Sequence, residues 1–78
     1  MQLDIITPDR TIYAGEVTLV QLPGKDGSFE ILNQHAPMIA VLKEGKVKIQ
    51  DMDKKTQFFD IKGGVVEVLN NKVLVLSD

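Results

Sequence analysis

Apolar and polar residues alternate along most of this chain, and that alternation constrains its fold more than any other feature. The clearest case is the segment KVKIQ at residues 46–50, where Val47 and Ile49 project to one face of an extended chain and the lysines to the other. No window shows the i, i+3, i+4, i+7 apolar spacing of an amphipathic helix. The pattern therefore predicts strands and essentially no helix.

Short runs rich in β-branched and other apolar residues are the predicted strands: residues 3–7, 16–22, 28–32, 38–42, 46–50, 57–62, 65–69 and 73–77. Turn-forming residues stand between them: residues 23–27, Glu44-Gly45, residues 51–55, Gly63-Gly64 and Asn70-Asn71. Asn tolerates positive φ, so Asn70-Asn71 predicts a two-residue type I′ hairpin. That hairpin would pair residues 66–69 antiparallel with residues 72–75.

A chain of 78 residues is the size of one domain, and it contains no internal repeat or linker. Many short strands at close spacing favour a sandwich or a barrel. We therefore expect residues 1–78 to form a single all-β domain.

Composition excludes several classes of function. The chain has no cysteine, which removes disulfides, thiolate metal sites and cysteine nucleophiles. Its net charge of −2 is far from the basic footprint of a nucleic-acid-binding protein. Its uninterrupted apolar runs are short, as at residues 38–42, so we expect neither a membrane-spanning segment nor an export signal.

Catalytic motifs are also missing. Neither Ser28 nor Ser77 stands in a G-x-S-x-G elbow, and His35 is the one histidine, without an H-x-x-x-H partner for zinc. The glycines in residues 24–27 lack the spacing of a phosphate-binding loop. We expect no catalytic residue, cofactor or metal ion.

The unusual segment is Asn33-Gln34-His35-Ala36-Pro37, which lies between two predicted strands. Its proline forces Ala36 into an extended conformation and fixes a bend at the rim of the fold. One interpretation is a rigid corner with a satisfied histidine. The other is a docking edge, because the apolar run at residues 38–42 that follows is longer than a surface loop normally carries.

Several segments resemble one known family, and they occur in the same order along the chain: LDIITP at residues 3–8, YAGEV at 13–17, GSFEILNQHAP at 27–37, LKEGKVKI at 42–49 and IKGGVVEV at 61–68. The chain resembles the N-terminal β-sandwich domain of the epsilon subunit of rotary F-type ATP synthases. The resemblance implies a flattened β-sandwich of two about five-stranded, mostly antiparallel sheets.

The resemblance also implies a role. In that family the domain is a non-catalytic subunit of the central-stalk rotor of the proton-translocating ATP synthase. It couples the gamma subunit to the c-ring during ATP synthesis and needs no cofactor. We then expect the chain on the cytoplasmic face of the energy-transducing membrane, the inner membrane of a bacterium, and in contact with that membrane only through the complex.

Site residues carried over from the resemblance form two groups. The segment facing the c-ring comprises Ser28, Glu30, Asn33, Gln34, His35 and Ala36. The side facing the gamma subunit comprises Thr7, Met38 and Ala40.

The chain departs from the family pattern in three places. Family members usually continue into a C-terminal helical hairpin, whereas this sequence stops at Asp78. Asn33-Gln34 stands where the family commonly has Pro-Gly, and Ser28 stands where an acidic residue is often found. Glu30, two residues further along the same strand face, is the expected substitute for that acid.

Two alternatives belong to other classes. A lipoyl or biotinyl carrier domain is also short and all-β, and Lys54 in the predicted turn at residues 51–55 would be its attachment site. The two similar halves of a carrier domain are not visible in this sequence. The other alternative is a β-sandwich interaction module that binds an unrelated protein through residues 28–42.

Overall fold

The computed structural model describes residues 1–78 and contains six β-strands and no helix, as the alternation predicts. The strands are β1 (Gln2–Ile6), β2 (Thr11–Gly24), β3 (Gly27–Leu32), β4 (Met38–Asp51), β5 (Thr56–Leu69) and β6 (Lys72–Ser77). Burial alternates along them, most simply in β1, where Leu3 and Ile5 are buried and their neighbours are half-buried. An extended chain turns successive side chains to opposite faces, which explains this pattern.

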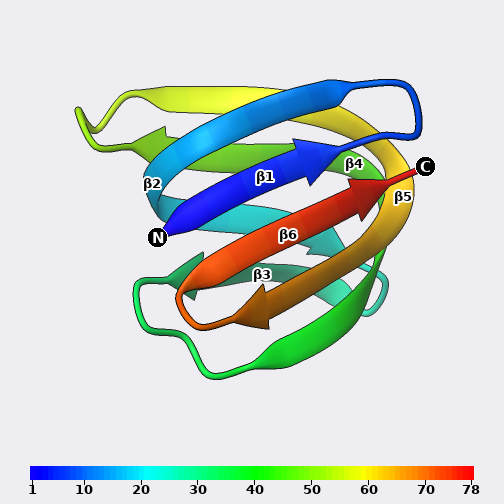
Figure 1. Ribbon diagram of the computed structural model, residues 1–78. Coiled ribbons are helices and arrows are strands. Elements are labelled where there is room, and N and C mark those ends of the chain that lie inside the picture. The colour runs from blue at the N-terminus through cyan, green and yellow to red at the C-terminus, as the bar shows by residue number, and fades with distance from the viewer.

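All six strands belong to one hydrogen-bonded sheet in the order β1-β6-β5-β4-β2-β3. β1 also pairs with β2, so that five of the strands close into a barrel-like ring and β3 lies outside it on the edge of β2. β1 and β6 are parallel and run side by side in Figure 1, and the other neighbouring strands are antiparallel.

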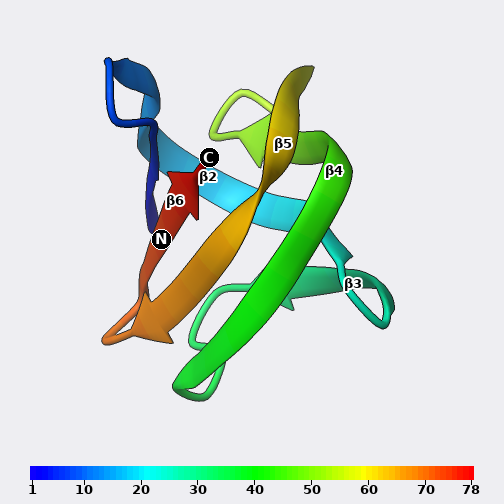
Figure 2. The ribbon, with the colours of Figure 1, turned by 90° about the vertical axis from the view of Figure 1, so that its right-hand side faces the viewer.

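The two separate five-stranded sheets that the resemblance implies are therefore not found. β2, β4 and β5 each have 14 residues. Fully extended strands of that length would span about 46 Å, whereas the longest dimension of the molecule is 27 Å. Each long strand therefore has to bend round the barrel. β5 runs along the top of Figure 1, curves round the right-hand side and returns below. Figure 2 shows the twist near its middle.

Merged strands also explain two turns that were predicted wrongly. Residues 38–42 and 46–50 are both in β4, and residues 57–62 and 65–69 are both in β5, so that neither Glu44-Gly45 nor Gly63-Gly64 reverses the chain. Pairing continues past them, with Leu42 opposite Gly64 and Gly45 opposite Ile61. Gly63 and Gly64 have φ of 121° and 139°, and they bend β5 without ending it.

Other turns form where they were predicted. Asn70 and Asn71 both have positive φ, 51° and 58°, and they join β5 to β6 with Leu69 opposite Lys72 and Val66 opposite Val75. The segment 51–55 is a turn in which the Asp51 carboxylate accepts hydrogen bonds from the amides of Asp53 and Lys55, both at 2.9 Å. Lys25 and Asp26 form the turn between β2 and β3.

The core consists of apolar side chains that all six strands turn inward. Val47 and Ile49 are fully buried and Lys46 is exposed, so that the predicted facing of this segment is confirmed. The buried cluster contains Met1, Leu3, Ile5, Val17, Val20, Leu22, Ile31, Leu42, Val47, Ile49, Ile61, Val66, Val68, Val73 and Val75. The four pockets of the molecule all open to its surface, and none is enclosed within this core.

Candidate functional site

Residues 33–37, here called the bend, join β3 to β4 and are exposed. Three distant parts of the chain meet there: the bend, the N-terminus and the turn between β5 and β6, all on the left-hand side of Figure 1. The side-chain oxygen of Asn33 accepts a hydrogen bond of 2.8 Å from the amino group of Met1. That amino group also donates to the Val17 carbonyl at 3.0 Å and lies 3.3 Å from a Glu16 carboxylate oxygen. Asn33 is thus part of the internal bonding of this end of the molecule.

Gln34 adopts a left-handed backbone conformation with φ of 63°. This region is uncommon for a residue that is not glycine. Its N–H donates a 2.8 Å hydrogen bond to the side-chain oxygen of Asn71, 37 positions later in the chain. The main chain of Asn71 accepts a further bond, from the Gln2 amide at 3.2 Å. The bend is therefore tied to the turn between β5 and β6.

His35 is exposed and lies at the tip of the bend. Its Nδ1 lies 2.7 Å from the Ala36 carbonyl oxygen. A carbonyl oxygen can only accept, so Nδ1 carries the proton and donates it. Nε2 makes no hydrogen bond within the molecule, and the Pro37 ring fixes the chain that follows. The bend thus presents an imidazole on a constrained backbone.

Ser28 and Glu30 are exposed on one face of β3, while Phe29 and Ile31 between and beyond them turn toward the core. Glu30 is three residues from the bend. Ser28 lies at the other end of β3, opposite Pro23, and five residues of extended chain separate it from Asn33 by about 16 Å. The six predicted ring-side residues therefore lie along β3 and the bend as an extended strip.

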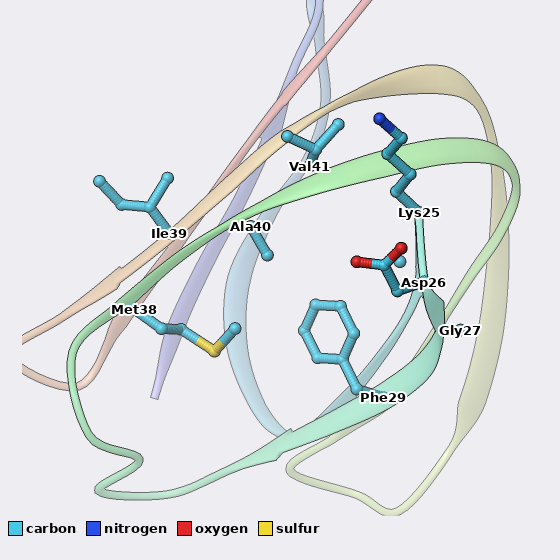
Figure 3. Close-up of a pocket in the computed structure, with 9 residues that line it drawn as sticks. Lys25, Asp26, Gly27, Phe29, Met38, Ile39, Ala40 and Val41 are labelled. Carbon is cyan, nitrogen blue, oxygen red and sulfur yellow. The ribbon is translucent and has the colours of Figure 1, made fainter.

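The predicted gamma-side residues of β4 face inward. Met38 and Ala40 are half-buried and point toward Phe29 across an open notch of about 400 Å³. Lys25 and Asp26 stand at the rim of this notch (Figure 3). Thr7 lies in the loop after β1, where its hydroxyl oxygen accepts hydrogen bonds from the amides of Asp9 and Arg10.

Apolar side chains gather on the outer surface of β1, β4, β5 and β6. Strand pairing places Val41 opposite Val65, Val65 opposite Leu76, and Leu76 opposite Ile6, which makes one apolar row across four strands. We call this surface the apolar face; its residues are Ile6, Ile39, Val41, Val65, Leu69, Leu74 and Leu76.

The apolar face is open to solvent. Ile39 is 72% exposed, Val41 56% and Leu76 50%. Single exposed apolar residues are ordinary, but a contiguous group on paired strands indicates a surface that another molecule covers. Two carboxylates stand in the row beside it, since Glu67 pairs with Ile39 and with Leu74, and Leu74 pairs with Asp4. A partner that covers this face must satisfy or avoid these charges.

Sequence reasoning missed the outward residues of β4. It selected Met38 and Ala40, whereas Ile39 and Val41 occupy the apolar face. The uninterrupted apolar run at residues 38–42 contained the necessary information. A strand with one solvated face alternates, and a continuous run requires both faces to be apolar.

The other features considered in the sequence do not form a site with these surfaces. Lys54 is exposed in the turn between β4 and β5, with φ of 62°. No group of three or more histidine or acidic side chains is gathered so that it could hold a metal ion. The structure has no helix with the length and hydrophobicity that a membrane crossing requires. Burial, and to a lesser extent the charge of Asp51, raises the pKa of Tyr13, whose ring packs against Phe59 with centroids 5.3 Å apart.

Comparison with known proteins supports the resemblance seen in the sequence. The ATP synthase epsilon chain of Chlorobium limicola is 47% identical over 77 residues, which cover 99% of this chain and 88% of that one. The epsilon chain of Lawsonia intracellularis is 45% identical over 78 residues, which cover all of this chain and 58% of that one. The carrier-domain alternative gains no support from these relatives.

A solved structure shares the fold. A chain of the Euglena gracilis mitochondrial ATP synthase, in its assembly of OSCP, F1 and c-ring, superposes with a TM-score of 0.90 over 96% of this chain and 48% of that chain, at 19% identity. The family profile described as "ATP synthase, Delta/Epsilon chain, beta-sandwich domain" matches residues 1–78. The all-β fold and the similarity over the whole length agree, and the chain belongs to the family of ATP synthase epsilon chains.

Proposed function

We propose that residues 1–78 form one non-catalytic unit of the central-stalk rotor of an ATP synthase, and that this unit couples the gamma subunit to the c-ring. Membership of the epsilon-chain family supports this role. The observation that carries it is the apolar face, a contiguous group of exposed apolar side chains over four paired strands. Such a molecule is suited to holding two partners in a fixed relation.

The gamma subunit is the proposed occupant of the apolar face. The face is continuous over four strands, and an interface of standard size buries about 800 Å² on each partner, which a sheet face of this kind can supply. In this proposal the contact on β4 is made by Ile39 and Val41. Met38 and Ala40 support them from the inner side of the same strand, and Thr7 holds the loop next to Ile6 at the edge of the face.

The c-ring is the proposed partner of the strip formed by β3 and the bend. Its residues are Ser28, Glu30, Asn33, Gln34, His35 and Ala36. The strip is exposed and mostly polar, with Leu32, 53% exposed, on the same face of β3 as Ser28 and Glu30. A mostly polar surface is expected for a contact with polar loops rather than with a hydrophobic surface. Glu30 supplies the one carboxylate on this strip.

The proposal includes a place in the cell. A subunit held between the gamma subunit and the c-ring would lie on the cytoplasmic face of the energy-transducing membrane, the inner membrane in a bacterium, without entering the lipid. No side chain of this chain takes part in ATP chemistry, because the role is mechanical and the catalytic steps belong to other subunits.

An assembly experiment with two sets of variants tests both contacts. The tagged full chain is expressed in its source organism, and the subunits that are recovered with it from solubilised membranes are quantified. V41D places a carboxylate at the centre of the apolar face and should reduce recovery of the gamma subunit at least tenfold, since it adds an unpaired charge to a desolvated surface. Lys62→Asp, at an exposed position of β5 outside the apolar face, is the control and should leave recovery unchanged.

The second set addresses the c-ring. H35A combined with E30A should preserve the fold, because both side chains are exposed. It should weaken the coupling of ATP hydrolysis to proton pumping in the assembled enzyme. Full gamma recovery with V41D, or normal coupling with the double variant, would contradict the corresponding half of the proposal.

A further inference from the structure

We propose that Asn71 is a positioning residue for the bend: its side-chain oxygen holds Gln34 in the left-handed conformation in which the bend is presented to the c-ring. The inference rests on the proposed function for the identity of the partner. Asn71 lies in the turn between β5 and β6 and is outside the strip to which that function assigns the contact.

The first step of the argument is conformational. Gln34 has a Cβ, and at φ of 63° that Cβ is crowded against its own backbone, a conformation that costs of order tenfold to a hundredfold in population for an unsupported residue. The bend is exposed and contributes nothing to the buried cluster. Packing therefore does not supply the constraint, and hydrogen bonds have to.

The second step identifies the bond. The Gln34 amide hydrogen has one acceptor, the Asn71 side-chain oxygen at 2.8 Å, and this distance is near the optimum for N–H···O. Asn71 is itself fixed. Its main-chain oxygen accepts from the Gln2 amide, and the paired strands on either side hold its turn. An acceptor held by its own strand pairing thus anchors the Gln34 amide.

The third step concerns the consequences for His35. Gln34 directly precedes His35, so a change in the backbone angles of Gln34 swings the imidazole and everything up to Pro37. Asn33 on the other side is held by the Met1 amino group. Without the Asn71 bond, the segment from Gln34 to Ala36 is held only at Asn33 on one side and at Pro37 on the other.

The chain offers a well-matched test. N71G removes the side chain but keeps a residue that readily adopts positive φ, and Asn-Gly is a favoured sequence for a type I′ turn. N70G is the control, because it makes the same change one position earlier, where the exposed side chain makes no hydrogen bond with the rest of the molecule. N71D is the rescue variant, since a carboxylate oxygen can accept the same bond.

Two measurements are made on the full chain. The first is hydrogen exchange of the Gln34 amide, which should become roughly 2- to 12-fold faster in N71G, the factor that a net hydrogen bond contributes. The second is the affinity of the chain for the rotor of the source organism, isolated as gamma subunit and c-ring without this chain. This affinity should fall by a similar factor in N71G. N71D should restore both values, and N70G should change neither.

The outcomes separate the inference from the proposed function. Unchanged exchange at Gln34 in N71G, or equal rotor affinities for N71G and N70G, would overturn the positioning role. Failure of the proposed function has another signature: the unaltered chain then does not bind the rotor, while the exchange measurement still reports whether Asn71 holds the bend.

Discussion

Gly64 shows at the scale of one residue how the path of β5 is determined. A Cβ at this position would lie 2.0 Å from the Leu76 carbonyl oxygen and 3.0 Å from the Ser77 Cα, and φ is 139°. Only a residue without a side chain allows β6 to approach so closely while β5 bends. The curvature at Gly64 turns β5 round the barrel. The apolar face depends on this curvature because Val65 follows directly.

Gly27 provides an internal control for a prediction about Gly64. Its φ is 135°, nearly the same, but a Cβ there would meet nothing within 4 Å. G27A should therefore lose only the conformational cost, roughly 1–2 kcal/mol. G64A adds a collision with main-chain atoms and should lose at least ~2 kcal/mol more.

Urea unfolding of the two variants, followed by circular dichroism, measures both losses. The difference between G64A and G27A isolates the close approach of β6 from the backbone conformation. Equal losses would show that β6 can move away, and that Gly64 is retained for its φ alone.

At the scale of the element, the sequence predicts facing and hairpins well but not the length of strands. Alternation identifies Val47 and Ile49 as buried, and Asn70-Asn71 as a hairpin. Gly63-Gly64 was predicted as a turn because glycine marks turns and strand bends alike. Whether a turn or a strand bend forms depends on pairing with a distant part of the chain, here that of Leu42 with Gly64. The residues near Gly64 in the sequence carry no information about that pairing.

The same limit applies to the candidate site. The unusual composition of the bend can be recognised within a few residues, as can the proline that shapes it. Asn71 could not be selected, because its partner Gln34 is 37 positions away and the bond depends on how β6 closes the sheet. The apolar face is likewise a property of four strands in register, although the unbroken run at residues 38–42 gives a partial indication.

β4 provides a prediction that separates folding from binding. Val47 is fully buried and Val41 is 56% exposed, on the same strand. V47D would bury an unpaired carboxylate and should cost more than ~3 kcal/mol, which approaches the whole stability expected of so small a domain, ~3–5 kcal/mol. V41D makes the identical substitution at an exposed site and should stay folded.

Circular dichroism and size-exclusion chromatography of the two isolated variants test this. V47D should be unfolded or aggregated, and V41D should elute as the unaltered chain does. A folded, soluble V47D would contradict the inward facing of Val47, and an unfolded V41D would remove its value as a probe of the gamma contact.

For the whole molecule, closure of the sheet is what makes the chain suitable for transmitting force. In the ring β1-β6-β5-β4-β2 every strand pairs with two others, so the ring cannot open without breaking a ladder of hydrogen bonds. β2, β4 and β5 run unbroken through the bends of the ring, so its sides are joined by continuous chain as well as by hydrogen bonds. β3 is the exception, since it pairs with β2 alone.

β3 should therefore open separately from the ring, and this is the prediction for the molecule as a whole. It is anchored by the buried Ile31, the half-buried Phe29 and one ladder of bonds to β2, which is far less than holds any other strand.

Hydrogen exchange in low concentrations of denaturant distinguishes local from global opening. The β3 amides that bond to β2 should exchange with a lower free energy and a smaller denaturant dependence than the amides that join β4 to β5, which require global unfolding. A common free energy and a common slope for both sets would show that β3 is an integral part of the rigid body. The part of the strip that carries Glu30 would then be as stiff as the apolar face.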